Sequence, residues 1–203
     1  MIDVRGLACE RGDSALFSAL SFELSPGKVL LVRGANGSGK TSLLRILGGL
    51  SAPREGEVRW CGERVAPLAP ALRSHTLYLG HAAPLKDDLT VSENLAYALR
   101  LDGCTASRQR CHDALHSVGL GARLRLPARQ LSQGQRRRIG IARMMLARRT
   151  LWLLDEPTTA LDAQGVELFK SVLTAHLASH GLAVVTTHQA LDIGSALQEL
   201  TLQ

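Results

Sequence analysis

Aromatic residues are scarce in this chain, since two Trp, two Tyr and three Phe make up 3% of its 203 residues. Proteins that bind single-stranded nucleic acid stack bases on aromatic side chains. The scarcity therefore argues against that class, although the net charge is +6. The basic residues are almost all Arg, scattered except for one cluster at Arg136–Arg138. We expect no nucleic-acid partner, because a basic surface facing phosphate groups or anionic lipid explains the charge at least as well.

Long apolar runs are also missing. The longest, Val29–Val32 and Leu182–Val185, have the length of strands and are far too short to cross a bilayer. Charged residues at Asp3, Arg5 and Glu10 leave no hydrophobic segment of the kind found in signal peptides. We expect a protein of the cytosol that serves any membrane from its surface.

No C-x-x-C pair occurs, so the four cysteines are expected to be reduced thiols at core or surface positions: Cys9, Cys61, Cys104 and Cys111. Two histidine pairs have the i, i+4 spacing of one helix face: His112/His116 and His176/His180. Each pair could hold a metal, but neither has the Glu beside the first His that a zinc protease helix requires. Solvated helix faces are the favoured interpretation.

The order of the elements indicates a single α/β domain. We expect strands at 2–8, 19–24, 28–33, 56–60, 76–80, 151–155 and 182–187. We expect helices at 40–50, 92–101, 107–118, 134–149 and 164–178. Strand, loop and helix alternate at both ends of the chain, which predicts a parallel sheet with helices on both faces. The helical stretch 88–149 reads as an insertion on that sheet.

Residues 34–41, GANGSGKT, fit the G-x-x-x-x-G-K-[ST] pattern of a phosphate-binding loop. The pattern follows an apolar strand and opens a helix, whose free N–H groups and positive dipole end favour an anion. Lys40 adds a full charge near the β- and γ-phosphates, and the Thr41 hydroxyl is placed to bind Mg²⁺. The expected contacts are Gly34, Ala35, Asn36, Gly37, Ser38, Gly39, Lys40, Thr41 and Ser42. The sequence therefore predicts a nucleotide site.

Two acids, Asp155 and Glu156, end the apolar strand that begins at Leu151. Ligands of open α/β sheets bind at the carboxyl ends of the strands. Asp155 there can hold Mg²⁺ through water, and Glu156 can orient and polarise the water that attacks the γ-phosphate. By themselves, two acids after a strand are equally compatible with a helix cap.

Three further motifs follow in order: LSQGQ at 131–135, TALD at 159–162, and Thr187-His188 at the end of the next strand. With the phosphate loop and the two acids, they make the chain resemble the nucleotide-binding domain of ABC ATPases over nearly its whole length. The resemblance implies a P-loop NTPase fold with a mainly parallel core sheet flanked by helices, an antiparallel β subdomain and a helical insertion. It implies one domain over 1–203, with 1–87 and 150–203 as the core and 88–149 as the helical subdomain.

The resemblance also implies roles for the remaining motif residues. Ser132, Gly134 and Gln135, with the helix behind them, would present donors to a γ-phosphate bound by the opposite subunit, so the chain would act as a homodimer. Asp162 would lie at the dimer seam. His188 would contact the γ-phosphate and hold the attacking water with Glu156. The plainer alternatives are that Ser132 only caps a helix and that His188 is a surface residue.

The sequence departs from the family pattern at two positions. His81 stands where the family usually has a Gln that senses Mg²⁺ and the membrane partner. Because imidazole lacks the hard oxygen that Mg²⁺ prefers, His81 would act through water, and its titration is expected to tune turnover. Arg11 stands near the place of the usual adenine-stacking aromatic residue. Its guanidinium could lie on the base, and a solvent-exposed turn is the alternative.

Within the family, the G-H-x-x-P-L-K stretch at 80–86 and the opening of the chain resemble the ATP-binding subunits of cytochrome c maturation systems. That resemblance implies an ATPase at the cytoplasmic face of a bacterial inner membrane, with ATP and Mg²⁺ as cofactors. It implies an integral membrane permease as partner and haem delivery as the task. A non-transport ABC ATPase that assembles metal clusters is the alternative. The length leaves no room for the insertions of DNA-repair or translation relatives, and Lys40, Asp155, Glu156 and His188 oppose an inactive regulatory subunit.

Overall fold

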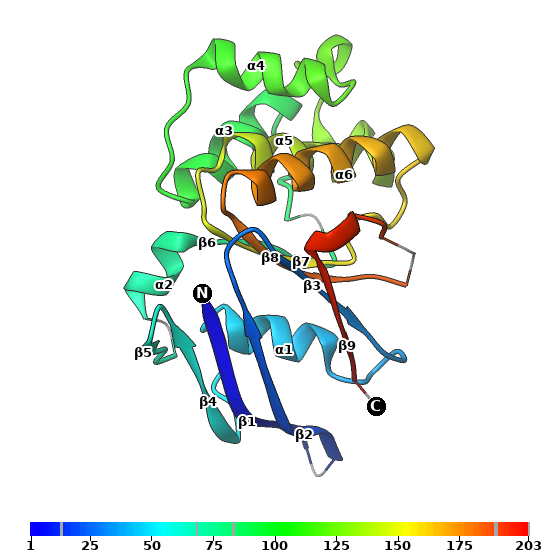
Figure 1. Cartoon of the computed structure of the whole chain (residues 1–203). Helices are drawn as coiled ribbons and strands as arrows, with labels where there is room; N and C mark the ends of the chain where they lie inside the picture. Colours follow the sequence, from blue (N-terminus) through cyan, green and yellow to red (C-terminus); the bar gives the residue numbers. More distant parts are fainter. Residues whose placement is uncertain (13, 68, 83, 189–190, 203) are drawn as a thin grey trace. The chain divides into compact units, whose positions relative to one another are not determined.

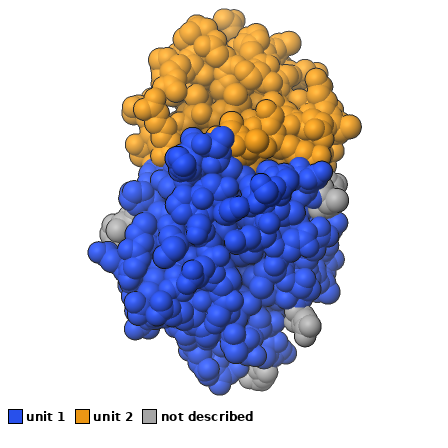
Figure 2. Space-filling view, viewed as in Figure 1, with its two compact units in different colours: residues 1–78, 149–156, 176–203 blue, residues 79–148, 157–175 orange. Residues whose placement is uncertain are grey.

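A computed structural model gives the fold and describes residues 1–12, 14–67, 69–82, 84–188 and 191–202. The chain forms two compact units (Figure 2). Unit 1 comprises residues 1–78, 149–156 and 176–203, and unit 2 comprises 79–148 and 157–175. The subdivision into core and helical subdomain that the sequence suggested stays a prediction, because these units are defined by packing alone.

Unit 1 contains an antiparallel sheet in the order β2-β1-β4-β5 and a second sheet in the order β6-β7-β8-β3-β9 (Figure 1). The antiparallel strands are β1 (Ile2–Arg11), β2 (Ser14–Leu24), β4 (Glu55–Trp60) and β5 (Glu63–Arg64). The second sheet has β3 (Val29–Arg33), β6 (Thr76–Leu79), β7 (Leu151–Asp155), β8 (Leu182–Thr186) and β9 (Leu197–Thr201). The pairs β7–β8, β3–β8 and β3–β9 are all parallel.

The core of unit 1 joins both sheets to helix α1 (Lys40–Leu47). Strands β7 and β8 are buried at every position, as expected of parallel strands covered on both faces. Side chains from β1, β3, β7, β8 and α1 share one apolar cluster, which includes Leu7, Val32, Leu43, Leu153 and Val184. Helix α2 (Pro70–His75) completes the unit.

Unit 2 is helical. Helices α3 (Val91–Leu101), α4 (Arg108–Ser117) and α5 (Gln133–Leu146) contact one another (Figure 1). Most of α6 (Ala163–Ala178) belongs to the same unit. Thr90 with Glu93 and Ser132 with Gln135 form capping boxes that start α3 and α5. Among the described residues, none of the helices has the length and apolar composition needed to cross a lipid bilayer.

The predicted fold class is confirmed: the structure has the mainly parallel sheet, the antiparallel sheet and the helical segment. Several boundaries were wrong, because β2 begins at Ser14 instead of residue 19 and α1 ends at Leu47 instead of residue 50. The sequence reading missed β5, α2 and β9. The first two are very short, and β9 is an edge strand whose residues are largely exposed, so none carries a strong apolar pattern.

Candidate nucleotide-binding site

The phosphate loop of unit 1 connects the buried strand β3 to α1. Gly34, Gly37 and Gly39 have φ angles of 152°, 87° and 94°, a region that favours glycine. Gly34 is also confined by its neighbours, since a Cβ there would lie 2.5 Å from Ser38 Oγ and 2.7 Å from the Leu202 carbonyl oxygen. The loop therefore requires glycine at residue 34 for space as well as for backbone conformation.

Lys40 holds the loop from its own helix. Its Nζ donates hydrogen bonds to the Gly34 carbonyl at 2.7 Å and the Ala35 carbonyl at 2.9 Å. The side chain is buried, so the positive charge lies inside the loop. Ser38 Oγ is buried and has no hydrogen-bond partner within the part of the chain that the structure describes. A buried cation beside an unsatisfied hydroxyl fits an incoming phosphate oxygen.

Asp155 joins three elements at the carboxyl end of β7. Its Oδ2 accepts a hydrogen bond from Thr41 Oγ1 at 2.8 Å, and its Oδ1 accepts one from Thr186 Oγ1 at 2.7 Å. The carboxylate is 2% exposed. Thr41 and Asp155 thus bring two hard oxygen ligands together beside the phosphate loop, a donor set that suits Mg²⁺. The residues present fit the metal that the sequence predicts.

Glu156 turns out of the strand with a left-handed backbone, φ 49°. Its N–H donates to the carbonyl and the hydroxyl oxygen of Thr186, at 3.1 and 3.0 Å. Its Oε1 lies 3.4 Å from Nε2 of His188, whose side chain is 56% exposed. Because a non-glycine residue in this conformation is uncommon and requires support from its surroundings, we infer that the Thr186 bonds fix the direction of the Glu156 side chain.

Unit 2 carries the LSQGQ segment at the start of α5. Ser132 Oγ accepts a hydrogen bond from the Gln135 N–H at 3.3 Å, and Gln135 Oε1 accepts one from the Ser132 N–H at 3.1 Å. Ser132 therefore caps the helix, and its hydroxyl hydrogen takes no part in these two bonds, so the expected contact with a γ-phosphate stays a prediction. A Cβ on Gly134 would lie 2.5 Å from the Ala160 carbonyl oxygen, so glycine lets α5 approach the TALD segment.

Asp162 ends the TALD segment and is bonded within unit 2. Its Oδ1 accepts hydrogen bonds from the Gly165 N–H at 2.9 Å and from Arg138 Nη2 at 2.7 Å. These donors lower the pKa of the Asp162 carboxyl, the Gly165 N–H more than the guanidinium. Asp162 is thus held as an anion on the same segment that Gly134 contacts.

The two departures from the family pattern lie at exposed positions. The His81 side chain is exposed, and its carbonyl oxygen accepts a hydrogen bond from Arg137. Arg11 is the exposed last residue of β1. Their expected roles in metal sensing and base stacking stay predictions.

The structure therefore brings the predicted residues together in two groups. Unit 1 gathers the phosphate loop, Asp155, Glu156 and His188, and unit 2 gathers the LSQGQ segment and Asp162.

The cysteine and histidine predictions had different outcomes. All four cysteines are free thiols, as expected. The expectation of solvated faces for the histidine pairs is wrong at His176, which is buried and stacked on Trp152 with ring centroids 3.7 Å apart. The flanking Gly181 makes room for the ring, since a Cβ there would collide with it.

Sequence reasoning missed two residues that support the site. Thr186 is fully buried and bonds both acids, and Arg137 bonds the backbone at Gly80 and His81. The signal for Thr186 was a polar residue at the end of an otherwise apolar strand. Arg137 had no signal beyond the charge cluster, because its partners lie far away in the sequence.

The sequence profile of the ABC transporter family matches residues 17–159. This chain belongs to the ABC transporter family. It is 50% identical over 191 residues to the cytochrome c biogenesis ATP-binding export protein CcmA of Nitrosomonas europaea, covering 94% of this chain and 90% of the relative. It is 42% identical over the full length of both chains to the protein of the same name from Dechloromonas aromatica. The resemblance to ABC ATPases and to their cytochrome c maturation members is confirmed.

Solved structures of ABC cassettes share the fold. The dimeric structure of MJ0796, a bacterial ABC transporter cassette, aligns with a TM-score of 0.82 and 26% identity over 99% of this chain and 94% of that one. A dimeric post-hydrolysis state of MJ0796 bound to ADP and Pi aligns with a TM-score of 0.81 and 25% identity over 93% of this chain and 88% of that one. These structures are of dimers, and one holds the products of ATP hydrolysis.

Proposed function

We propose that this chain is the ATP-hydrolysing subunit of an exporter that delivers haem for cytochrome c biogenesis. The observation that carries the proposal is the cluster in unit 1, where Lys40 lies in the phosphate loop, Thr41 bonds Asp155, and Glu156 lies beside His188. The names of the relatives support the cytochrome c task. We place the chain at the cytoplasmic face of an inner membrane.

In the proposed reaction, the phosphate loop binds ATP through its backbone N–H groups and Lys40. Thr41 Oγ1 and Asp155 would hold Mg²⁺, which supplies neutralisation of the phosphate charge when bound. Glu156 orients the water that attacks the γ-phosphate in line with the leaving oxygen. His188 donates toward the same phosphate. Thr186 fixes the position of Asp155 relative to Glu156, because its hydroxyl bonds both residues.

The second half of the proposed site comes from another copy of the chain. Ser132, Gly134 and the N-terminus of α5 would present donors to the γ-phosphate held by the opposite subunit. Asp162 would face the dimer seam. The dimeric cassettes among the structural relatives support this arrangement. Closure of the dimer would exclude water and complete the site.

Substitution of Glu156 by Gln tests the proposed reaction. The general-base role predicts a fall in kcat of about 10²–10⁴-fold with ATP binding retained. Glu167→Gln on the exposed face of α6 is the matched control, since it makes the same chemical change at a surface ion pair. Sedimentation of Glu156→Gln with Mg-ATP should show a dimer. Hydrolysis by Glu156→Gln at the wild-type rate would remove Glu156 from the mechanism.

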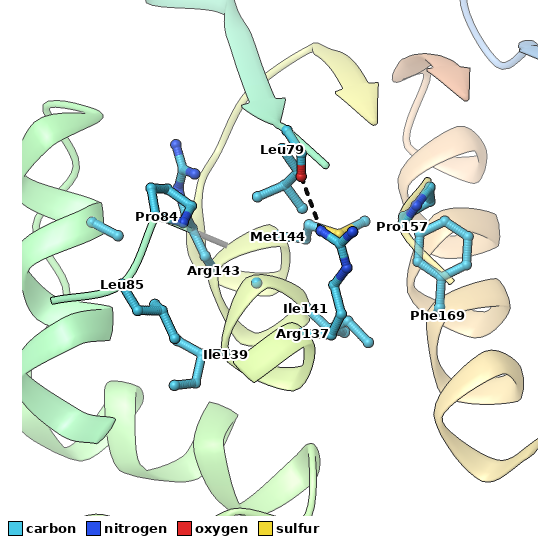
Figure 3. Close-up of a pocket in the computed structure, with 13 residues that line it drawn as sticks. Leu79, Pro84, Leu85, Arg137, Ile139, Ile141, Arg143, Met144, Pro157 and Phe169 are labelled. Carbon is cyan, nitrogen blue, oxygen red and sulfur yellow. Dashed lines mark hydrogen bonds between the residues drawn. The ribbon is translucent and has the colours of Figure 1, made fainter. Parts of the chain in front are cut away.

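An apolar pocket in unit 2 is the proposed docking place for the membrane permease. Its volume is about 40 Å³, and its walls include Leu79, Leu85, Ile139, Met144 and Phe169 (Figure 3). A pocket of this size suits one apolar side chain from a partner. The loop that carries His81 forms part of the wall through Gly80 and Pro84, so an occupant would touch that loop directly.

Filling the pocket from within tests the docking place. Ala98 lines it from α3, and Ala98→Trp should abolish co-purification with a multi-span membrane protein while the basal ATPase remains. Leu101→Trp is the control, because Leu101 is the last residue of the same helix and is 71% exposed. Capture of soluble assembly factors in place of a membrane protein would favour the alternative of a non-transport ATPase.

A further inference from the structure

Arg137 connects helix α5 to the main chain beside His81. Its Nη1 donates to the Gly80 carbonyl at 2.9 Å, and its Nη2 donates to the His81 carbonyl at 2.5 Å. Figure 3 shows the first of these bonds at the edge of the pocket. A planar guanidinium suits two adjacent acceptors, which a lysine ammonium cannot engage with the same geometry. The contact therefore fixes both the position and the direction of the loop backbone.

The neighbouring arginines make different contacts. Arg136 pairs with Asp87 at 2.7 Å, and Arg138 donates to the Val118 carbonyl and to Asp162. The three arginines of the basic cluster therefore each bond a different part of unit 2. Within the part of the chain that the structure describes, Arg137 is the one of the three that donates to main-chain oxygens of the loop carrying His81.

The tether starts close to the proposed γ-phosphate contact. Arg137 lies roughly 7–8 Å along the α5 axis from Ser132, at about 1.5 Å per residue. The helix between them begins with the capping box of Ser132 and Gln135, which stabilises its first turn. A displacement of Ser132 would therefore move Arg137 with it, and the two bonds would pass the movement to the Gly80–His81 backbone.

We propose that Arg137 is a positioning residue that transmits engagement of ATP at Ser132 to the loop carrying His81. The proposal rests on the proposed function, in which Ser132 contacts a γ-phosphate and the His81 loop lines the docking pocket. It assigns the transmission to the loop backbone, so the His81 side chain depends on Arg137 for its placement. ATP binding at Gly34–Thr41 does not depend on it.

Steady-state kinetics of Arg137→Gln and Arg137→Lys test the inference on the full-length protein. We expect Arg137→Gln to lower kcat about 5- to 30-fold, with KM for ATP within about twofold of wild type. Arg137→Lys should recover part of the loss, because it restores the charge without the fork. Ethylguanidinium should raise the turnover of Arg137→Ala. Arg100→Gln, an exposed arginine on α3, is the control.

A double-mutant cycle with His81→Ala separates positioning from general stability. His81→Ala should change turnover in the wild-type background. It should cause no further change in Arg137→Gln, because there the loop has already lost its hydrogen bonds to Arg137. Equal effects of His81→Ala in both backgrounds would overturn the inference. So would a wild-type kcat in Arg137→Gln.

Hydrogen exchange provides a readout that does not depend on turnover. In Glu156→Gln, Mg-ATP should increase protection of the peptide that spans Tyr78–Ala82, and adding Arg137→Gln should abolish the increase. If Mg-ATP still increased the protection of this peptide after the loss of Arg137, the inference would be contradicted. If wild type lacked ATPase activity, or if Glu156→Gln matched it, the proposed function would fail instead and this inference would fall with it.

Discussion

The two units hold their candidate site residues in different ways. In unit 1, Asp155 is 2% exposed and bonds Thr41 at the start of α1 and Thr186 at the end of β8. In unit 2, the side chain of Asp162 is 65% exposed and bonds Arg138 at the surface. Hydrogen bonds shielded from water are stronger and more costly to break than exposed ion pairs. The acid of the phosphate-binding half is therefore held more firmly than the acid of the LSQGQ half.

Substitution of Gly34 by Ala should produce the largest effect on ATP binding, because the space around residue 34 of the phosphate loop is so small. The added Cβ would collide with Ser38 and Leu202 and distort the loop. We expect ATP affinity to fall by about tenfold or more, since backbone strain of about 1–3 kcal/mol is enough for such a loss. Titration with a fluorescent ATP analogue measures it.

Gly62→Ala is the matched control for that change. Gly62 has φ 88° at the turn between β4 and β5, and nothing lies within 4 Å of its added Cβ. It therefore shares the cost of an unfavourable backbone conformation without the collision. Equal losses of ATP affinity in both variants would mean that the tight fit at Gly34 has no part in phosphate binding.

Substitution of Thr186 by Val tests the buried hydrogen bonds of unit 1 directly. The change keeps the shape of the side chain but removes a donor from Asp155 and an acceptor from Glu156. We expect a loss of about 1–3 kcal/mol in the free energy of unfolding, because buried polar partners are left unsatisfied. Urea denaturation measures it. Thr174→Val on the exposed face of α6 is the control, and an equal effect there would refute the role of burial.

Substitution of Ser132 by Ala tests the LSQGQ segment of unit 2. Thr90 and Ser132 begin α3 and α5 with the same capping box, so Ala at either position should cost about 1 kcal/mol of stability. The expected difference is functional, because only Ser132 would contact a γ-phosphate. Thermal melts and ATPase rates of both variants measure the two effects. Equal ATPase rates in Ser132→Ala and Thr90→Ala would reduce Ser132 to a helix cap.

The comparison of units also explains how far the sequence could be read. The phosphate loop and the buried strands depend on neighbours in the sequence, so their patterns predicted them. Thr186 and Arg137 act on partners that the fold brings from distant positions, at Asp155 and Gly80. The sequence did not predict strand β9 because it lies at the edge of the sheet, where it pairs with β3, and its own apolar and polar residues alternate only weakly.

The histidine pairs carry the same lesson, since spacing along a helix cannot tell which face is covered. His116 is exposed on α4 in unit 2, whereas His176 in unit 1 is stacked on Trp152 and lies 3.1 Å from the Leu182 carbonyl oxygen through Nε2. The two positions look alike in the sequence, because each belongs to an i, i+4 pair of histidines near the end of a helix. The ring of Trp152 and the Leu182 carbonyl, both brought by the fold, distinguish His176 from His116.

Burial gives His176 a measurable signature, which is the smallest effect predicted. Burial lowers the pKa of His176, although its bonds to the Leu182 and Thr150 carbonyls oppose the shift. The histidine of the unfolded chain has a pKa of about 6.5. At a pH below this value the unfolded chain therefore binds a proton at this residue more readily than the folded chain does. Stability should therefore be constant for this group above about pH 6.5 and decline as the pH falls below it.

The slope of unfolding free energy against pH between about 5 and 7 measures that contribution. His176→Gln should make the slope shallower, whatever it does to stability at neutral pH. His116→Gln removes a histidine without touching the ring stack and serves as the control. If the two variants changed the slope equally, burial against Trp152 would not be what sets the proton affinity of His176, and the contrast between a shielded unit 1 and an exposed unit 2 would not extend to its titratable groups.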